Sequence, residues 1–350
     1  MRVSLKETEI IAPNFKKRLS GVTSTIVQLI PLQRKKGIRI STLGPGLPAS
    51  LPALNYASLL SLWKKPDDKP FRIWHARRNV EMVAGIVLRD VMRVKLKLVF
   101  TSAAQRYHKP FTNWLIRRMD KVIATSARSG SFLEVPYRVI MHGIDLERFT
   151  PPATDEDSFQ STKLPGKYAI GCFGRVRHQK GTDLFVDAMI ALLPHYPDWT
   201  AVITGRTTAE HQAFEKELRR KIAAAGLENR ILILGEVDDI RVWYRRISLY
   251  VAPSRNEGFG LTPLEAMASK TAVVASDAGA YSELIAKDCG TVVPAGDGAA
   301  LTEAIKPYLA NPQMTIAAGE KALAHVRKNF PLDKEATAIG NVYQELFCQK

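Results

Sequence analysis

The chain has 350 residues, of which 46% are hydrophobic and 24% charged, and its formal net charge is +16. This length has room for two domains, and the composition is ordinary for a soluble globular chain. No apolar run approaches the ~18 residues of a membrane-spanning helix, and the N-terminal sequence MRVSLKETEI lacks the apolar core of a signal peptide. Three widely separated cysteines without metal-ligand spacing predict reduced thiols in a cytoplasmic protein.

The positive charge is confined to the first part of the chain. Residues 1–150 hold 27 Lys and Arg against 10 Asp and Glu, whereas the remaining residues hold 23 against 24. Such an excess predicts an anionic partner, which is a nucleic acid, an anionic membrane or an acidic substrate. A basic surface that serves only solubility is the alternative explanation.

Apolar runs and helical spacing alternate over residues 1–150, which predicts a first Rossmann-like domain with a parallel sheet covered on both faces. We expect strands at 38–43, 71–74, 97–101, 121–124 and 139–141, and helices at 22–33, 80–91 and 103–118.

The polar, proline-rich residues 151–165 predict a linker. Beyond it we expect strands at 168–173, 199–204, 231–235, 249–252, 272–276 and 290–293, with helices at 182–193 and 209–225. This pattern predicts a second doubly wound domain over 166–330. We expect a final helix over 331–350, which is free to pack back on the first domain. Two Rossmann-like domains imply a ligand-binding cleft between them.

The segment GCFGRVRHQKG, residues 171–181, joins an expected strand to an expected helix. Gly174 would let a ligand approach the backbone, and the N-terminus of the helix favours an anion. Arg175 and Lys180 add the positive charge that a pyrophosphate requires. The spacing is not Gly-x-Gly-x-x-Gly, so it does not support a dinucleotide site. An ordinary turn with exposed basic side chains is the alternative.

A second segment, SRNEGFGLTPLEAMA at 254–268, follows the strand expected at 249–252. Thr262 is placed as the N-cap of a helix, with Pro263 at its first position and Glu265 at capping-box spacing. Capping by Glu265 and a turn role for Glu257 are the structural alternatives. The functional interpretation is that amides and carboxylates at the end of a strand bind phosphate and sugar hydroxyls.

Together these segments carry a resemblance. Glu257 and Glu265 form E-x₇-E, the 174–181 segment precedes them, VVASDAGAYSELI follows at 273–285, and HGIDLERF stands at 142–149. The ordered set resembles the retaining glycosyltransferases of family 4, which have the GT-B fold, two Rossmann-like domains facing a central cleft. The first half also resembles the lipopolysaccharide core mannosyltransferases of alphaproteobacteria.

The resemblance assigns roles to individual residues. Arg175 and Lys180 would neutralise the donor diphosphate, Glu257 would contact the donor sugar, and Glu265 would bind the ribose. The turn after Gly235, with Val237, would contact the base. The expected catalytic set is Glu257, Lys180, Arg175 and His75, and the expected donor-binding set is Gly21, Gly174, Arg175, Lys180, Val237, Gly258, Phe259, Gly260, Leu261, Thr262 and Glu265.

The first half supplies the expected acceptor side. His75 follows a strand, where the family often has a histidine that lines the cleft, and a satisfied histidine in the cleft wall is the alternative. Arg77 and Arg78 are expected to bind an acidic acceptor, because guanidinium groups suit carboxylates and phosphates. Gly21 matches the family's glycine-rich loop, although its usual pair is Ser20-Gly21 here. Ala103 stands where the family often has histidine and is given no role.

The resemblance implies retaining transfer of a hexose, mannose from GDP-mannose, onto an inner core of lipopolysaccharide that carries 3-deoxy-octulosonate (Kdo). Departure of the diphosphate and attack by the acceptor are expected on one face of the sugar. No Asp-x-Asp motif lies in the segments expected at the cleft, so no metal is expected. Basic clusters predict peripheral association with the inner face of the cytoplasmic membrane. The alternatives are another donor or acceptor, an inactive scaffold, or a nucleic-acid-binding protein, whose usual motifs are missing.

Overall fold

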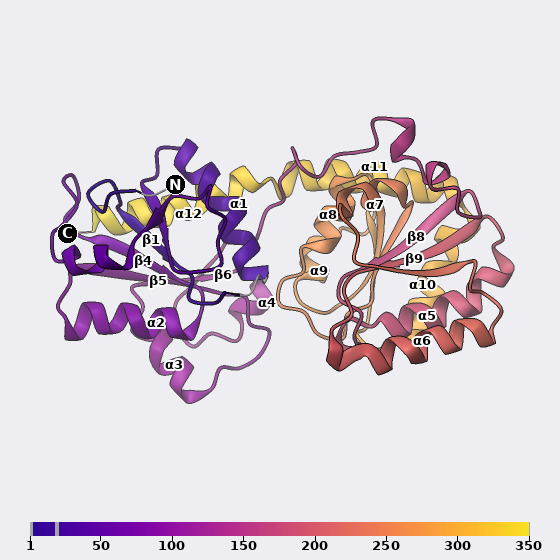
Figure 1. Cartoon of the computed structure of the whole chain (residues 1–350), viewed down its shortest axis with the longest axis horizontal. Helices are drawn as coiled ribbons and strands as arrows, with labels where there is room; N and C mark the ends of the chain where they lie inside the picture. Colours follow the sequence, from indigo (N-terminus) through magenta and orange to yellow (C-terminus); the bar gives the residue numbers. More distant parts are fainter. Residues whose placement is uncertain (1–2, 18–20, 350) are drawn as a thin grey trace. The chain divides into compact units, whose positions relative to one another are not determined.

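The computed structural model describes residues 3–17 and 21–349, and the chain forms two compact units (Figure 1). The N-terminal unit runs to Gly143 and includes the chain from Leu332 onward, and the C-terminal unit is Ile144–Pro331. Each contains an all-parallel sheet, so the predicted α/β class with two Rossmann-like units is confirmed. The chain changes units at Gly143 and Leu332, whereas we expected the first domain to extend to residue 150.

Seven parallel strands form the described sheet of the N-terminal unit. Their order across the sheet is β3 (Ala53–Leu54), β2 (Ile40–Leu43), β1 (Ile10–Pro13), β4 (Arg72–Ala76), β5 (Leu96–Ser102), β6 (Lys121–Ala124) and β7 (Arg138–Val139). The helices are α1 (Gly21–Lys35), α2 (Asn79–Ile86), α3 (Pro110–Ile116), α4 (Ala127–Gly130) and α12 (Leu332–Cys348), and a π-helix, Val87–Val91, continues α2.

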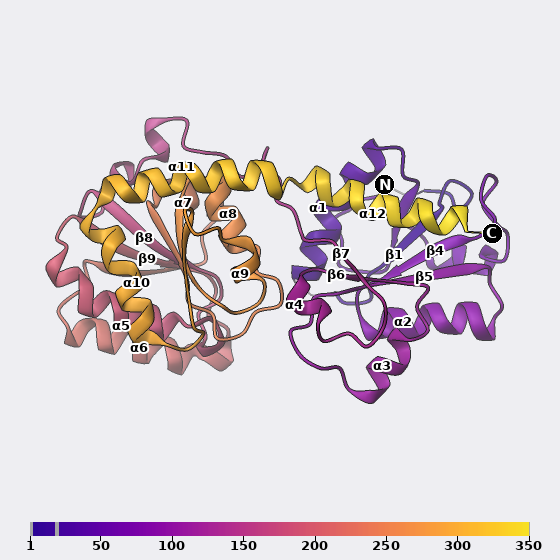
Figure 2. The same ribbon diagram turned by 180° about the vertical axis from the view of Figure 1, so that it is seen from behind.

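Alternation along the strands builds two cores, because successive side chains point to opposite faces of a sheet. Ile11, Trp74 and Leu98 pack with α2 and α3, whereas Ile10 and Ile73 pack with α1 and α12. Figure 2 shows α1 and α12 on one side of the sheet and α2 and α3 on the other. The last helix of the chain thus completes the core of the first unit.

The helix expected at 103–118 is shorter in the structure. It begins at Pro110, and the preceding residue, Lys109, is extended with φ −64° and ψ 153°. A residue before proline avoids helical torsions, and proline is favoured in the first turn, so Pro110 sets the start of α3. Residues 103–109 form the loop that leads into it.

The C-terminal unit has a six-stranded parallel sheet in its described part. The order is β10 (Ile231–Gly235), β9 (Trp199–Thr204), β8 (Tyr168–Phe173), β11 (Leu249–Ala252), β12 (Ala272–Ser276) and β13 (Gly290–Val293). All six strands have the predicted bounds. The helices are α5 (Thr182–Leu192), α6 (Gln212–Ala224), α7 (Ile240–Arg246), α8 (Thr262–Ala268), α9 (Tyr281–Leu284), α10 (Gly298–Ala310) and α11 (Pro312–Asn329).

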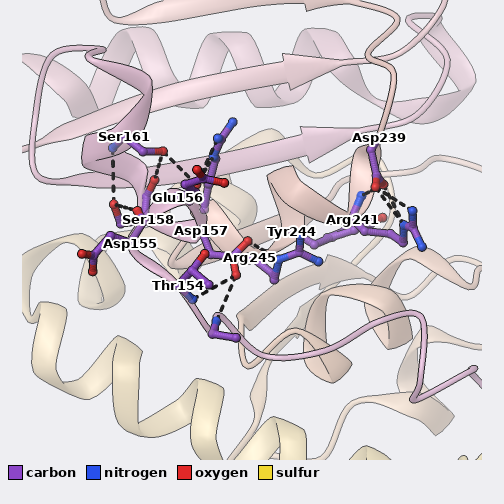
Figure 3. A network of polar contacts seen from close by, with 12 residues as sticks. Thr154, Asp155, Glu156, Asp157, Ser158, Ser161, Asp239, Arg241, Tyr244 and Arg245 are labelled. Carbon is purple, nitrogen blue, oxygen red and sulfur yellow. Dashed lines mark hydrogen bonds and ion pairs between the residues drawn. The ribbon is translucent and has the colours of Figure 1, made fainter.

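The segment expected to be a linker, 151–165, is bound to the C-terminal unit (Figure 3). It forms two short 3-10 helices, Asp155–Asp157 and Phe159–Thr162. Arg245 on α7 donates to the Asp157 carboxylate at 2.5 Å, and the backbone N–H of Ala153 donates to the other oxygen at 3.0 Å. Burial opposes ionisation of Asp157, but these hydrogen bonds outweigh it and lower its pKa.

None of the helices within residues 3–17 and 21–349 has both the length and the apolar composition needed to cross a bilayer.

Candidate active site

The two predicted segments meet at the switch point of the C-terminal sheet. β8 lies beside β11, and the chain order runs outward from this pair in both directions, through β9 and β10 on one side and β12 and β13 on the other. Open α/β sheets bind ligands beyond the carboxyl ends of strands at such a point. The loops 174–181 and 253–261 leave β8 and β11 there, so the topology brings together the residues that the sequence singled out.

Two glycines of the loop 174–181 have positive φ, and one of them lets this loop lie close to the loop 253–261. Gly174 has φ +134°, and Gly181 has φ +70°. A Cβ on Gly181 would stand 1.9 Å from the backbone oxygen of Pro253, which no side chain can do without moving one of the loops. Gly181 is also the N-cap of α5. The close contact between the two loops therefore depends on glycine.

The Lys180 ammonium donates to the Glu257 carboxylate, and this pair joins the two loops. Each side chain is 20% exposed, so both reach the surface. The other oxygen of Glu257 accepts from the backbone N–H of Gly258 at 3.1 Å. The structure thus places two residues from the expected catalytic set in direct contact at the switch point.

Arg255, which the sequence analysis gave no role, is the second connection between the loops. Its guanidinium binds both oxygens of Asp183 at 2.7 and 2.8 Å, and it also donates to the carbonyl of His178 at 2.8 Å. The pKa of Asp183 is lowered because the hydrogen bond from Arg255 outweighs the effect of burial. Its position inside the SRNEG segment was the available signal.

Thr262 is not the N-cap that we expected. The cap position is Leu261, which has no side-chain capping bond, and Thr262 is the first residue of α8. The Glu265 carboxylate accepts from the Tyr244 hydroxyl at 2.7 Å rather than from the start of its own helix. Burial raises the pKa of Glu265 above its usual range. The capping-box prediction was wrong because a tyrosine from α7 takes the carboxylate.

The remaining expected donor residues surround this centre. Arg175 is exposed at the end of β8, and Lys180, Thr182, Thr262 and Tyr281 help to line a small pocket between the loops. Gly258, Phe259, Gly260 and Leu261 form the loop before α8. Gly260 has φ +90°, and a Cβ there would stand 2.2 Å from the ring of Tyr281, so this buried tyrosine supports the loop.

The turn after Gly235 lies between β10 and α7. Val237 is half-buried in it, and Asp239 caps α7 by accepting from the backbone N–H of Arg241 at 2.9 Å. The Arg241 guanidinium also binds Asp239 at 2.7 Å (Figure 3). The carboxylate of Asp239 is therefore held by its own helix.

His75 lies in the core of the N-terminal unit. It has no exposed surface, and its ring nitrogens pair with the Tyr343 hydroxyl at 2.6 Å and the Thr101 hydroxyl at 2.7 Å. Burial keeps the pKa of His75 well below its usual range. Because the ring is buried and both of its nitrogens are occupied, His75 fits the structural alternative of a satisfied histidine better than a catalytic role.

Arg78 is likewise engaged inside the N-terminal unit. It donates to Asn14 at 2.7 Å, to the buried Glu81 at 2.8 Å and to Thr23 at 3.1 Å. These contacts tie the end of β4 to α1, α2 and the loop after β1. The predicted acceptor role of Arg78 conflicts with this placement, because its charge is already matched by a buried carboxylate.

Arg77 and Gly21 are the other predicted residues of this unit. The Arg77 guanidinium donates to the His75 carbonyl at 3.2 Å, and burial lowers its pKa. Gly21 is exposed at the first position of α1, and a Cβ there would meet nothing within 4 Å. Ser20, its partner in the expected loop, lies outside the described residues.

No three His, Cys, Asp or Glu side chains within residues 3–17 and 21–349 lie close enough together to hold a metal ion.

Comparison with known proteins shows the family to which the chain belongs. Residues 167–311, which contain both loops, match the family model described as glycosyl transferases group 1. The chain is 65% identical over 343 residues to the lipopolysaccharide core biosynthesis mannosyltransferase LpcC of Rhizobium leguminosarum bv. viciae, covering 98% of this chain and 97% of the relative. It is 53% identical to LpsB of Rhizobium meliloti, which has the same description, covering 98% and 99%.

A solved structure extends the likeness to the whole fold. Anabaena HepE in complex with UDP and glucose is similar at a TM-score of 0.80 and 20% identity, covering 97% of this chain and all of that one. At this identity the likeness concerns the fold alone. The match to LpcC covers almost the whole of both sequences. The chain is a glycosyltransferase and belongs to the family of the lipopolysaccharide core biosynthesis mannosyltransferases.

Proposed function

We propose that this enzyme transfers mannose from GDP-mannose, with retention of anomeric configuration, onto the Kdo-containing inner core of lipopolysaccharide. The observation that carries the proposal is the Lys180–Glu257 pair, which joins the two switch-point loops in a chain 65% identical to a lipopolysaccharide core mannosyltransferase. The choice of mannose and of the core acceptor follows the two relatives, which are lipopolysaccharide core biosynthesis mannosyltransferases. GDP is the part of the donor that the resemblance alone supports.

The diphosphate would lie against Gly174, Arg175 and Lys180. Arg175 is exposed, and the Lys180 ammonium is partly exposed beside Glu257, so both cations can be reached from solvent. Negative charge develops on the leaving diphosphate as the glycosidic bond breaks, and cations already in place stabilise that state more than the ground state. Amides of the loop 258–262 would add hydrogen bonds. We therefore propose that the enzyme works without a metal ion.

Glu257 and Glu265 would bind the two sugars of the donor. Glu257 would accept bonds from mannose hydroxyls while it keeps its contact with Lys180. Glu265 would bind the ribose by accepting hydrogen bonds from its hydroxyls, as it accepts one from Tyr244 in the structure. The turn that contains Val237 would contact the base.

The transfer step would occur on one face of mannose. The bond between the anomeric carbon and the diphosphate oxygen breaks, and the acceptor hydroxyl forms its new bond from the same side. The departing diphosphate oxygen takes the proton of that hydroxyl, so no further base is needed. His75 has no part in this scheme, because it is buried and both of its nitrogens are occupied.

The N-terminal unit would receive the acidic acceptor at the cytoplasmic face of the membrane. Its large basic excess supports this assignment, since Kdo and lipid A carry carboxylate and phosphate groups. Arg77 remains the proposed contact for these groups, whereas Arg78 serves the fold.

A donor screen tests the proposal. Purified enzyme is incubated with Kdo-bearing lipid A and one of GDP-mannose, UDP-glucose or ADP-heptose, each with and without EDTA, and products are identified by mass spectrometry and by the configuration of the new bond. We expect a mannosylated, retained product with GDP-mannose in both EDTA arms. Transfer from another donor, loss of activity with EDTA or an inverted product would each refute the corresponding part of the proposal.

A further inference from the structure

The outer stripe of α2 is apolar where a surface helix normally carries polar residues. Together with its π-helical continuation, α2 presents a row of exposed valines at helical spacing, namely Val80, Val83, Val87 and Val91. The opposite side of the same helix already fills the core with Met82 and Ile86. The valine row is therefore additional to what the fold requires, and Val91 alone is 72% exposed.

Helix α3 continues this apolar surface with two aromatic rings. Phe111 is 59% exposed and Trp114 is 45% exposed, and the rings stack with centroids 6.0 Å apart. The Asn79 amide donates to the Thr112 hydroxyl at 2.8 Å, which joins the starts of α2 and α3. Figures 1 and 2 both show the two helices side by side on one side of the N-terminal sheet. We call the four valines, Phe111 and Trp114 the α2–α3 face.

Exposed basic residues flank α2 and α3 along the chain. Residues 79–120 contain eight Lys and Arg and three Asp and Glu. The three acidic residues are each bound to arginine: Glu81 to Arg78, and Asp90 and Asp120 to Arg89. The exposed basic residues beside the face are Arg93, Lys95, Arg106, Lys109, Arg117 and Arg118. Arg117 pairs with Glu134, and Arg118 lies over the Trp114 ring at 3.8 Å.

We propose that the α2–α3 face docks on an anionic lipid bilayer. Its partner must be apolar and negatively charged at once, and a bilayer with anionic headgroups offers both properties in one surface. Tryptophan favours the interfacial region, and valine and phenylalanine favour the layer just below it. This inference rests on the proposed function in one respect: docking on a membrane brings the enzyme to its acceptor only if that acceptor is linked to a lipid.

Vesicle binding tests the inference with the full chain. Wild type and the double variant Phe111→Ser/Trp114→Ser are sedimented with phosphatidylcholine vesicles that contain or lack phosphatidylglycerol. We expect wild type to bind the anionic vesicles. The partition coefficient of the double variant should be roughly 30-fold lower, because it lacks the two aromatic side chains that would be buried in the bilayer. The control Met314→Ser/Ile316→Ser removes two exposed apolar residues from α11 in the C-terminal unit and is expected to bind like wild type.

Two further variants make the test robust. Val87→Ser/Val91→Ser removes apolar side chains without touching the aromatic pair and is expected to weaken binding in the same direction. Lys95→Glu/Lys109→Glu is expected to weaken binding to anionic vesicles only, and that loss should match the effect of high salt on wild type. Circular dichroism and thermal denaturation establish that each variant is folded.

The outcomes separate docking from catalysis. Equal vesicle binding by wild type and both apolar variants would overturn the inference. So would a wild-type dimer, without lipid, that the same substitutions dissociate, because the face would then contact a second copy. Transfer to a Kdo oligosaccharide without lipid is expected to be unchanged in the face variants. If that transfer fails in wild type while vesicle binding behaves as expected, the proposed function is wrong and docking stands.

Discussion

The two units have the same kind of switch point and use it differently. In the C-terminal unit, the loops beyond β8 and β11 carry glycines with positive φ and a partly exposed Lys180–Glu257 pair. In the N-terminal unit, the region beyond β1 and β4 is closed by Arg78, which binds Asn14 and the fully buried Glu81. A cation at the end of a strand is thus partly exposed in one unit, where we propose that it binds the donor, and is an internal connector in the other.

Because of this difference, the net charge of a unit does not show whether its basic residues bind a ligand. The first 150 residues hold nearly all of the excess charge, but part of that charge is structural. Arg72 is buried and donates to the carbonyls of Thr8 and Leu5, and burial lowers its pKa. The less basic unit carries the cations that we assign to the reaction. The role of a basic residue therefore depends on its accessibility and its partners, and the count of basic residues in a unit does not reveal it.

We expect the largest effect on stability when the connection that Arg78 makes within the N-terminal unit is removed. Arg78→Ala leaves the Glu81 carboxylate buried without its cation, which typically costs about 3–5 kcal/mol of unfolding free energy. Urea unfolding followed by circular dichroism measures it, with the exposed Lys35→Ala on α1 as control. A stable Arg78→Ala protein that has lost only acceptor binding would restore the predicted acceptor role.

The matching change in the C-terminal unit should affect the reaction instead. Lys180→Ala is expected to lower kcat for mannose transfer by on the order of 10²–10³, as loss of a preorganised charge typically does. Its unfolding free energy should change by less than about 1 kcal/mol, because a partly exposed ion pair contributes little. Steady-state kinetics measures kcat. The control is Lys216→Ala, which replaces an exposed lysine of α6. Wild-type kcat in Lys180→Ala would contradict the site.

A smaller effect is expected where residues 151–165 bind α7. Asp157→Ala removes the partner of Arg245 and an acceptor of the Ala153 N–H, which should cost about 2 kcal/mol. The lowered pKa of Asp157 means that its contribution is present at neutral pH and is lost as pH falls through the folded-state pKa. Thermal denaturation at neutral and acidic pH checks both points, and a variant as stable as wild type would show that the segment is a linker after all.

The smallest effect concerns His75. Because burial lowers its pKa, the unfolded chain takes up the proton first as the pH falls below about 6.5. Stability should therefore decrease on acidification by up to about 1.4 kcal/mol per pH unit, and be fully present above that pH. His75→Gln should flatten this slope in urea titrations. An unchanged slope would mean that His75 already carries a proton or is open to solvent.

The sequence predicted those features that depend on neighbours along the chain. Buried parallel strands appear as apolar runs between turn residues, so six strands of the C-terminal unit have their predicted bounds. The four-residue strand β1 was not predicted, although the equally short strands β11 and β13 were. Partners far along the chain were also out of reach: His75 bonds to Tyr343, 268 residues away, and Arg78 to Asn14, 64 residues away. The capping role of Glu265 was wrongly predicted for the same reason, since Tyr244, 21 residues away, takes its carboxylate.

Binding of GDP tests the central claim most directly. Isothermal titration calorimetry measures its Kd for wild type, Lys180→Ala and Lys216→Ala, without an acceptor and with EDTA present. We predict that GDP binds wild type and Lys216→Ala alike and binds Lys180→Ala at least about tenfold more weakly, since a charge-assisted contact to the diphosphate is lost. The same Kd in all three proteins would contradict a diphosphate site at the C-terminal switch point.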